Sequence, residues 1–289
     1  MITALVNGHA RKCIIDTGAT GTLMPHRGET LVQTLTETLP AHIFRSIGPP
    51  LPGMAPRPLT TSLVDSIQIG EYRVEGAPVV SFGVLPQDKY SPNVPGLGTN
   101  LFRNVSLTID WASMTMVIAS PASNMAPAQS TDWDQVLIFD PKAPGDQGDG
   151  RVLLHGTIAG SPSLLLFDTG SSILPLWIID RSLAKRLVRA QGSNSREEGQ
   201  LLDDVSWSIT GTQFHTSAFT DPWMTDAPFQ ALIGTQYLLV YRVGIDYPAH
   251  RLYLHKLTTS EHFYNGREHF TRGEMVERRE MLEGEVKKH

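Results

Sequence analysis

Cysteine is nearly absent from this chain of 289 residues, which contains only Cys13. A single cysteine excludes an internal disulfide, and Cys13 has no Cys or His partner at metal-ligand spacing. Because free cysteine is most often buried, we expect a structural thiol and not a nucleophile. The histidines share no ligand spacing and are expected at surface or turn positions: His9, His26, His155, His215 and His250. The sequence therefore predicts no metal site and no cofactor.

Long apolar runs and dense charge are also missing. No apolar run approaches the roughly 18 residues that span a bilayer, and the first residues show no basic head followed by an apolar stretch. Charged residues make up only 18% of the chain, with a formal net charge of −5. Acidic and basic residues are mixed, so no basic stripe offers itself to phosphate backbones. We expect a soluble chain without a membrane span or a nucleic-acid partner, cytoplasmic by default.

Glycine and proline, in contrast, are plentiful. The chain has 25 Gly and 20 Pro, and 40% of its residues are hydrophobic. This profile is typical of short strands joined by many turns, so we predict an all-β fold. A chain of this length is long enough for two lobes, each with a core of its own.

The triplet Asp-Thr-Gly occurs twice, at residues 16–18 and 168–170, and each copy follows an apolar run. Chance predicts about 0.06 copies of a given tripeptide in a chain of this length. Burying an ionised aspartate at the end of a strand costs on the order of several kcal/mol of free energy unless the charge has a partner. We therefore expect the side chains of Asp16 and Asp168 to lie together and form a pair.

An internal repeat surrounds the two triplets. At an offset of 152 residues Gly8 falls on Gly160 and Asp16 on Asp168, so each half reads as a hairpin that ends in Asp-Thr-Gly. A second pair of matching segments, 98–110 and 234–246, begins with Gly-Thr and ends with Ile-Asp. Asp110 and Asp246 are expected to be turn residues and not catalytic groups.

The repeat divides the chain into four parts. Residues 1–118 and 151–256 form the two predicted lobes. Residues 119–150 are rich in Ala, Ser, Pro, Asp and Gly and are predicted to be a linker with one short strand, 136–139. Residues 257–289 are dense in charge and form either a solvated tail or a helix that docks on the body or a partner.

These motifs resemble the two-lobed aspartic proteases of the retropepsin-like kind, in which one chain carries both halves of what retroviral enzymes assemble from two subunits. Ile-Asp-Thr-Gly-Ala (15–19) and Phe-Asp-Thr-Gly-Ser (167–171) match the first element of the family pattern. Leu-Ile-Gly (232–234) matches the second element, whereas Gly-Leu-Gly (96–98) has a glycine where an apolar residue is expected. The resemblance implies two β-barrel lobes related by a pseudo-twofold axis, with a cleft between them, in a monomer.

The resemblance also implies a reaction and its residues. Asp16 and Asp168 would hold a water between them, one as general base and one as general acid, and would hydrolyse a peptide bond of a polypeptide substrate. Around this dyad, the supporting residues implied by the family pattern are Thr17, Gly18, Ala19, Thr169, Gly170 and Ser171. The threonines would bond across the lobes, the glycines would allow close backbone approach, and the Ser171 hydroxyl, unlike Ala19, would donate to the dyad.

A lid and an alternative function complete the expectations. Residues 40–58 are predicted to be the flap over the substrate or an ordinary Pro-rich loop, and residues 191–200 are its shorter counterpart.

Besides an active endopeptidase, the sequence leaves open a catalytically silent or partner-activated scaffold of the same fold. The imperfect segment at Gly96 and a chain that starts directly in a strand, with no pro-segment ahead of it, favour that alternative.

Overall fold

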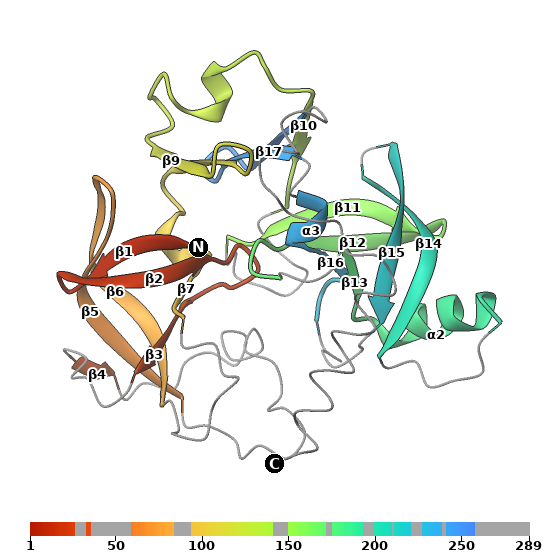
Figure 1. Ribbon diagram of the computed structural model, residues 1–289, viewed down its shortest axis with the longest axis horizontal. Helices are drawn as coiled ribbons and strands as arrows, with labels where there is room; N and C mark the ends of the chain where they lie inside the picture. Colours follow the sequence, from red (N-terminus) through yellow and green to blue (C-terminus); the bar gives the residue numbers. More distant parts are fainter. Residues whose placement is uncertain are drawn as a thin grey trace.

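The fold is all-β and consists of two closed six-stranded barrels and a third sheet (Figure 1). This is a computed structural model, and it describes residues 1–26, 33–35, 59–83, 94–140, 150–171, 175–192, 199–209, 211–220, 227–238 and 241–257. The predicted all-β class with two barrel lobes is confirmed. The predicted flap at 40–58, most of its counterpart at 191–200 and the tail from residue 258 lie outside the described residues.

The first barrel comes from the N-terminal half. Its strands are β1 (Ile2–Val6), β2 (His9–Ile15), β3 (Thr22–His26), β5 (Leu59–Ile69), β6 (Tyr72–Gly83) and β7 (Gly96–Leu97). They are ordered β1-β2-β7-β3-β6-β5, the pairing of β5 with β1 closes the barrel, and β4 (Gln33–Leu35) lies on the other edge of β5. Small and branched apolar side chains such as Cys13, Val64 and Leu97 fill its interior.

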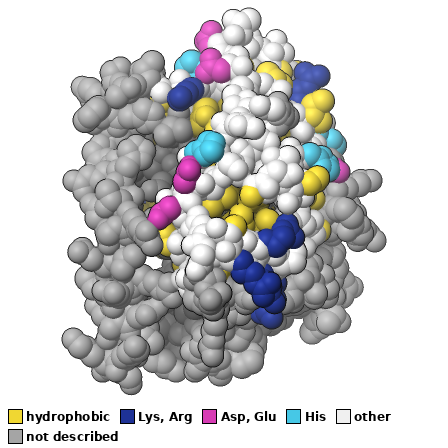
Figure 2. Space-filling view, turned by 90° about the vertical axis from the view of Figure 1, so that its right-hand side faces the viewer, with side chains coloured by type: hydrophobic (Ala, Val, Ile, Leu, Met, Phe, Trp, Pro, Cys, Tyr) yellow, Lys and Arg dark blue, Asp and Glu magenta, His cyan; other side chains and the backbone are white. Residues whose placement is uncertain are grey.

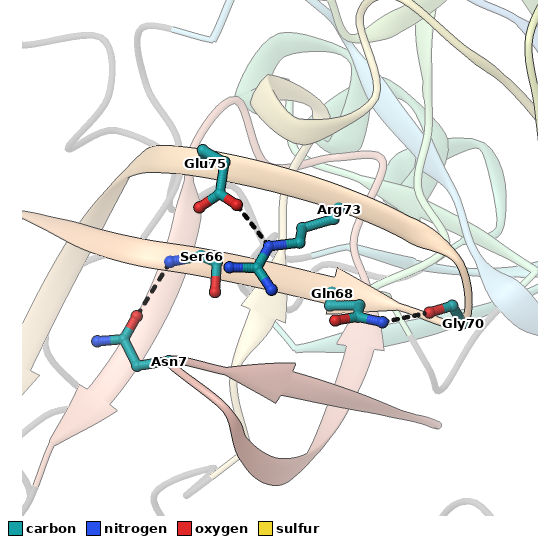
Figure 3. Close-up of polar contacts among 6 residues, drawn as sticks. All are labelled: Asn7, Ser66, Gln68, Gly70, Arg73 and Glu75. Carbon is teal, nitrogen blue, oxygen red and sulfur yellow. Dashed lines mark hydrogen bonds and ion pairs between the residues drawn. The ribbon is translucent and has the colours of Figure 1, made fainter.

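The closure of this barrel depends on the first hairpin turn. Asn7 and Gly8 both have positive φ, 49° and 80°, as the Asn-Gly hairpin signal predicts. The turn places Asn7 against β5, where its N–H donates to Ser66 O (2.9 Å) and its Oδ1 accepts from Ser66 N–H (3.1 Å) (Figure 3). At the exposed end of the neighbouring β5–β6 hairpin, Arg73 pairs with Glu75 within β6, and the Gln68 side chain donates to the Gly70 carbonyl (Figure 3).

The second barrel comes from the C-terminal half. Its strands are β11 (Val152–Ile158), β12 (Ser161–Phe167), β13 (Leu176–Ile178), β14 (Gln200–Ile209), β15 (Thr212–Thr220) and β16 (Ala231–Ile233). They close in the order β11-β12-β16-β13-β15-β14. A short helix, α3 (Thr235–Leu238), follows β16.

The helix α2 (Arg181–Ala190) packs on this barrel and begins at Asp180, whose side chain accepts from the Leu183 N–H (2.7 Å). Its apolar positions are buried and its basic positions are exposed, as expected for an amphipathic surface helix. The exposed basic residues are Arg181, Lys185, Arg186 and Arg189. Figure 2 shows basic side chains gathered low on this face, with His and acidic side chains above them.

The third sheet joins the two halves of the chain. Its order is β10 (Gln135–Ile138), β18 (Arg251–Lys256), β17 (Tyr241–Asp246), β8 (Ser106–Asp110) and β9 (Thr115–Ala119). The strands β8 and β17 are the ends of the second sequence repeat, and they pair antiparallel with Thr108 opposite Gly244. These two residues correspond to each other in the repeat, so a local twofold axis passes between them.

The structure confirms the expected turn role of Asp110 and Asp246 and the expected burial of Cys13. Asp110 and Asp246 accept backbone N–H groups of the turns that follow them, from Ala112 (2.9 Å) and from Ala249 (3.1 Å). Both are therefore turn residues, as predicted. Cys13 is fully buried, and burial raises its pKa to about 11, which leaves it a protonated structural thiol.

Segments outside the barrels cover the sheet at its axis. The 3₁₀ helix η3 (Pro127–Gln129) and Trp133 lie over Gly244, and Trp133 donates from its indole nitrogen to the Pro127 carbonyl (2.8 Å). A Cβ atom on Gly244 would lie 2.8 Å from Pro127 Cβ and 3.1 Å from the Trp133 ring. The linker therefore seals the sheet only because residue 244 has no side chain.

Replacing Gly244 with alanine should destabilise the protein by about 1–3 kcal/mol, because the added methyl overpacks this contact. Chemical denaturation of the variant and the parent gives this difference. Thr108→Ala, at the matching position of β8, serves as the comparison, and a Gly244→Ala variant as stable as the parent would contradict the packing described.

Candidate active site

The two Asp-Thr-Gly triplets occupy equivalent places in the two barrels. Each begins where a strand with an apolar end stops, β2 for Asp16 and β12 for Asp168. Each strand pairs in parallel with a short second strand, β7 or β16. The Asp16 N–H donates to Leu97 O and the Asp168 N–H donates to Ile233 O, both at 3.0 Å. Backbone pairing thus fixes both aspartates in the same way.

The threonines of the triplets tie the two barrels together by a reciprocal set of four hydrogen bonds. Thr17 Oγ1 donates to Phe167 O (2.8 Å), and Thr169 Oγ1 donates to Ile15 O (2.7 Å). Each hydroxyl also accepts the other threonine's backbone N–H, at 3.0 Å and 3.2 Å. Both threonines are buried, so every one of these groups depends on its partner.

The glycines let each triplet approach the other lobe's carboxyl group. A Cβ on Gly18 would lie 2.5 Å from Asp168 Cγ, and a Cβ on Gly170 would lie 2.5 Å from Asp16 Cγ. No side chain fits at either distance, so glycine is required at both positions. The predicted role of the two glycines in close approach agrees with this geometry.

Backbone N–H groups hold one oxygen of each carboxyl. Asp16 Oδ1 accepts from Gly18 (3.1 Å) and Ala19 (3.0 Å). Asp168 Oδ1 accepts from Gly170 (2.8 Å) and from the residue that follows it (3.2 Å). Such donors stabilise the ionised form, and they act equally on the two sides.

The electrostatics of the two aspartates are nevertheless unequal. Their carboxyl groups share a hydrogen bond. Burial raises the pKa of Asp168 well above its usual range, and the nearby charge of Asp16 raises it further. Burial also raises the pKa of Asp16, but the hydrogen bond from Asp168 and the backbone donors oppose that effect. Asp168 is buried, whereas Asp16 is only half-buried.

Ser171 supports Asp168 in a different way from the one the sequence suggested. Its backbone N–H donates to Asp168, while its buried hydroxyl has no hydrogen-bond partner in the described part of the chain. Ala19 supplies the matching N–H to Asp16. The expected donation from the serine hydroxyl to the dyad is thus replaced by a backbone contact that does not distinguish serine from alanine.

Sequence reasoning assigned no role to Thr99, Thr235 and Tyr247. Thr235 donates from its hydroxyl to Thr169 O (2.9 Å) and from its N–H to Ser171 O (2.7 Å), and the Thr99 N–H donates to Ala19 O (2.9 Å). Both threonines belong to the Gly-Thr pair that opens each copy of the second repeat, and this repetition was the sequence feature that could have indicated their role.

Tyr247 is buried, and burial together with the charge of Asp16 raises its pKa.

No group of three or more His, Cys, Asp or Glu in the described ranges is arranged to hold a metal ion. No helix among those same residues is long and apolar enough to cross a membrane. No known protein-family profile matches this chain, and no curated protein is significantly similar to it in sequence. The geometry of the site is therefore the basis for its assignment.

Replacing Thr169 with valine should destabilise the protein by about 2–4 kcal/mol, because it leaves the Ile15 carbonyl and the Thr17 N–H buried without partners. Thermal and urea unfolding measure the loss. Thr169→Ser keeps the hydroxyl and should recover most of the stability. Equal stability of the valine and serine variants would mean that the cross-lobe hydrogen bonds contribute little.

Proposed function

We propose that this protein is an aspartic endopeptidase that hydrolyses peptide bonds with a water held by Asp16 and Asp168. The observation that carries the proposal is the contact of two carboxyl groups from equivalent triplets, each held by two backbone donors. Two carboxyls in contact do not readily ionise together, so the pair keeps one shared proton at pH values above those at which an ordinary Asp ionises. The resemblance of the triplets to those of two-lobed aspartic proteases supports the same reading, with a monomer as the active species.

Both pKa values are raised, but on Asp168 the nearby charge of Asp16 adds to the effect of burial, whereas the hydrogen bond from Asp168 opposes it on Asp16. We therefore assign the shared proton to Asp168 and the ionised form to Asp16. In the proposed reaction Asp16 takes a proton from the bound water while the water oxygen attacks the carbonyl carbon of the substrate. Asp168 gives its proton to the carbonyl oxygen. The tetrahedral diol then collapses: the C–N bond breaks, the leaving nitrogen takes a proton from Asp16, and Asp168 takes one back from a hydroxyl of the diol as the new carbonyl forms. The dyad thus ends with one proton, as it began.

A protease-like binding scaffold, silent or activated by a partner, is the second candidate. The departure at Gly96 from the family pattern favours it. Incubation with a denatured protein, with and without a peptide-like aspartic protease inhibitor, separates the two candidates. Inhibitor-sensitive cleavage supports the endopeptidase, and no cleavage between pH 3 and pH 8 favours the scaffold.

Replacing either Asp16 or Asp168 with asparagine should lower turnover by about 10²–10⁴-fold or more, because the base or the acid is lost. The double variant should be no worse than the worse single variant, since the two groups act as one unit. Peptide-cleavage rates give the comparison, with circular dichroism as the check of folding. A single variant with parental turnover would remove that aspartate from the mechanism.

The same carboxyl pair should make stability fall as pH rises. The folded-state pKa of Asp168 is raised, so above about pH 4, where an unfolded Asp ionises, the folded state binds the extra proton. The contribution to stability is therefore present at low pH and is lost as pH rises toward the folded-state pKa, by up to about 1.4 kcal/mol per pH unit.

Asp168→Asn removes this titration, so the variant should gain stability over the parent at pH 7 and lose that gain near pH 4. Urea denaturation at several pH values gives both curves. If the stability of the two proteins depended on pH in the same way across this range, the pKa of Asp168 would not be raised in the folded state.

A further inference from the structure

Thr235 makes two hydrogen bonds to the turn that carries Asp168. Its N–H donates to Ser171 O (2.7 Å), and its hydroxyl donates to Thr169 O (2.9 Å). The parallel pairing of β16 with β12 places Ile233 beside Phe167, so the residue that opens α3 reaches the turn that follows β12. The side chains of Thr235 and Thr169 are buried, so these bonds are made away from bulk solvent.

The two bonds of Thr235 differ in what they require of the sequence. The backbone bond is repeated in the first lobe, where the Thr99 N–H donates to Ala19 O, the equivalent of Ser171 O. It belongs to the frame of both triplets and needs no particular side chain. The bond to Thr169 O, in contrast, needs a hydroxyl at position 235, and no other donor reaches that carbonyl in the described part of the chain.

The carbonyl that accepts this hydroxyl belongs to the peptide group that holds Asp168. Thr169 O and the Gly170 N–H are the two ends of one peptide unit, and the Gly170 N–H donates to Asp168 Oδ1 at 2.8 Å. A hydrogen bond accepted at the carbonyl polarises a peptide group and strengthens donation from its N–H, by about 10–30%. A chain of hydrogen bonds therefore runs from the Thr235 hydroxyl through this peptide to the Asp168 carboxyl.

The same peptide is also fixed toward the other lobe. The Thr169 hydroxyl donates to Ile15 O, and it accepts the Thr17 N–H. The side chain of Thr169 is thus held by the first lobe, while its carbonyl is held by Thr235 from the second lobe. Together these contacts set the direction in which the Gly170 N–H points.

Thr235 acts on Asp168 without carrying a charge. The titratable group whose charge acts on Asp168 is Asp16, and the charge of Asp16 also reaches the buried Tyr247. A substitution at position 235 leaves both of these groups in place. A change in the titration of the carboxyl pair would therefore report on the hydrogen bond that Thr235 makes.

We propose that Thr235 is a positioning residue, whose hydroxyl fixes the Thr169–Gly170 peptide and strengthens the bond from the Gly170 N–H to Asp168. Its role in the reaction rests on the proposed function. When Asp168 gives its proton to the substrate carbonyl, the carboxylate that forms is stabilised by this N–H, and the Thr235 hydroxyl increases that stabilisation.

Thr235→Cys and Thr235→Ser test the proposal, because both lack the methyl group and differ in the donor: a thiol is a weak donor and a hydroxyl a strong one. A weaker donor to the ionised form of Asp168 raises its pKa. In ¹³C NMR titrations of the full chain with labelled Asp, the higher of the pair's two titration steps should move upward by about 0.2–0.6 pH unit in Thr235→Cys. In Thr235→Ser it should stay near the parental value.

Peptide cleavage gives a second readout. In Thr235→Cys the alkaline limb of the pH–rate profile should move upward by the same amount. Turnover at the optimum should fall by about 2-fold or less, because Asp168 becomes a weaker acid. Thr235→Ser should restore both properties. A buried thiol stays protonated below about pH 8, so the new cysteine does not titrate in this range.

Thr20→Val is the control for the loss of a buried hydroxyl near the pair. The Thr20 hydroxyl is buried and has no hydrogen-bond partner among the residues that the structure describes. Its removal should leave both titration steps of the carboxyl pair at their parental positions.

The NMR readout separates this proposal from the proposed function. If the parent cleaves no peptide but Thr235→Cys raises the higher titration step, the endopeptidase assignment fails and the action of Thr235 on Asp168 stands. If Thr235→Cys and Thr235→Ser titrate alike, or if Thr235→Cys lowers that step, the proposal is overturned. A loss of stability in Thr235→Cys without a change in either titration step also overturns it, because Thr235 would then be a structural residue alone.

Discussion

A pair of carboxyl groups in contact, one of them buried, is the constraint on which the rest of this structure depends. Placing Asp16 and Asp168 together out of water costs free energy that one shared proton and four backbone donors offset. Those donors come from the turn that follows each aspartate, and the same turn passes close to the carboxyl of the other lobe. Glycine at 18 and 170 allows that approach, because any Cβ there would overlap a carboxyl. The composition of the triplets thus follows from the charge they hold.

The same constraint explains why the two barrels are joined twice. The hydroxyls of Thr17 and Thr169 cross between the lobes directly behind the aspartates. Farther away, β8 and β17 pair about the axis between Thr108 and Gly244. Each junction uses one of the two sequence repeats, and both are reciprocal, so the lobes are fixed on one another at two separated places. Two such attachments restrict rotation of one aspartate relative to the other more than a single contact would.

Much of this arrangement could be predicted from the sequence because the determining residues are local. The Asn-Gly turn, the apolar runs that end in Asp16 and Asp168, and the turn role of Asp110 all depend on neighbours within a few residues. The order of the third sheet could not be predicted, because β10 pairs with β18 more than a hundred residues away. The direction of the Ser171 hydroxyl also depends on packing from the other parts of the chain. For the same reason Thr235 was visible as a repeated residue without a visible role.

The two carboxyl groups are held alike but exposed unequally. Two identical carboxyls in identical surroundings share a proton equally. The backbone donors are the same in number on the two sides, two to each Oδ1. Asp168 is nevertheless buried, whereas Asp16 is half-buried. Because burial disfavours the charged form of a carboxyl, this difference in exposure favours the proton on Asp168 without any change in the frame that holds the pair.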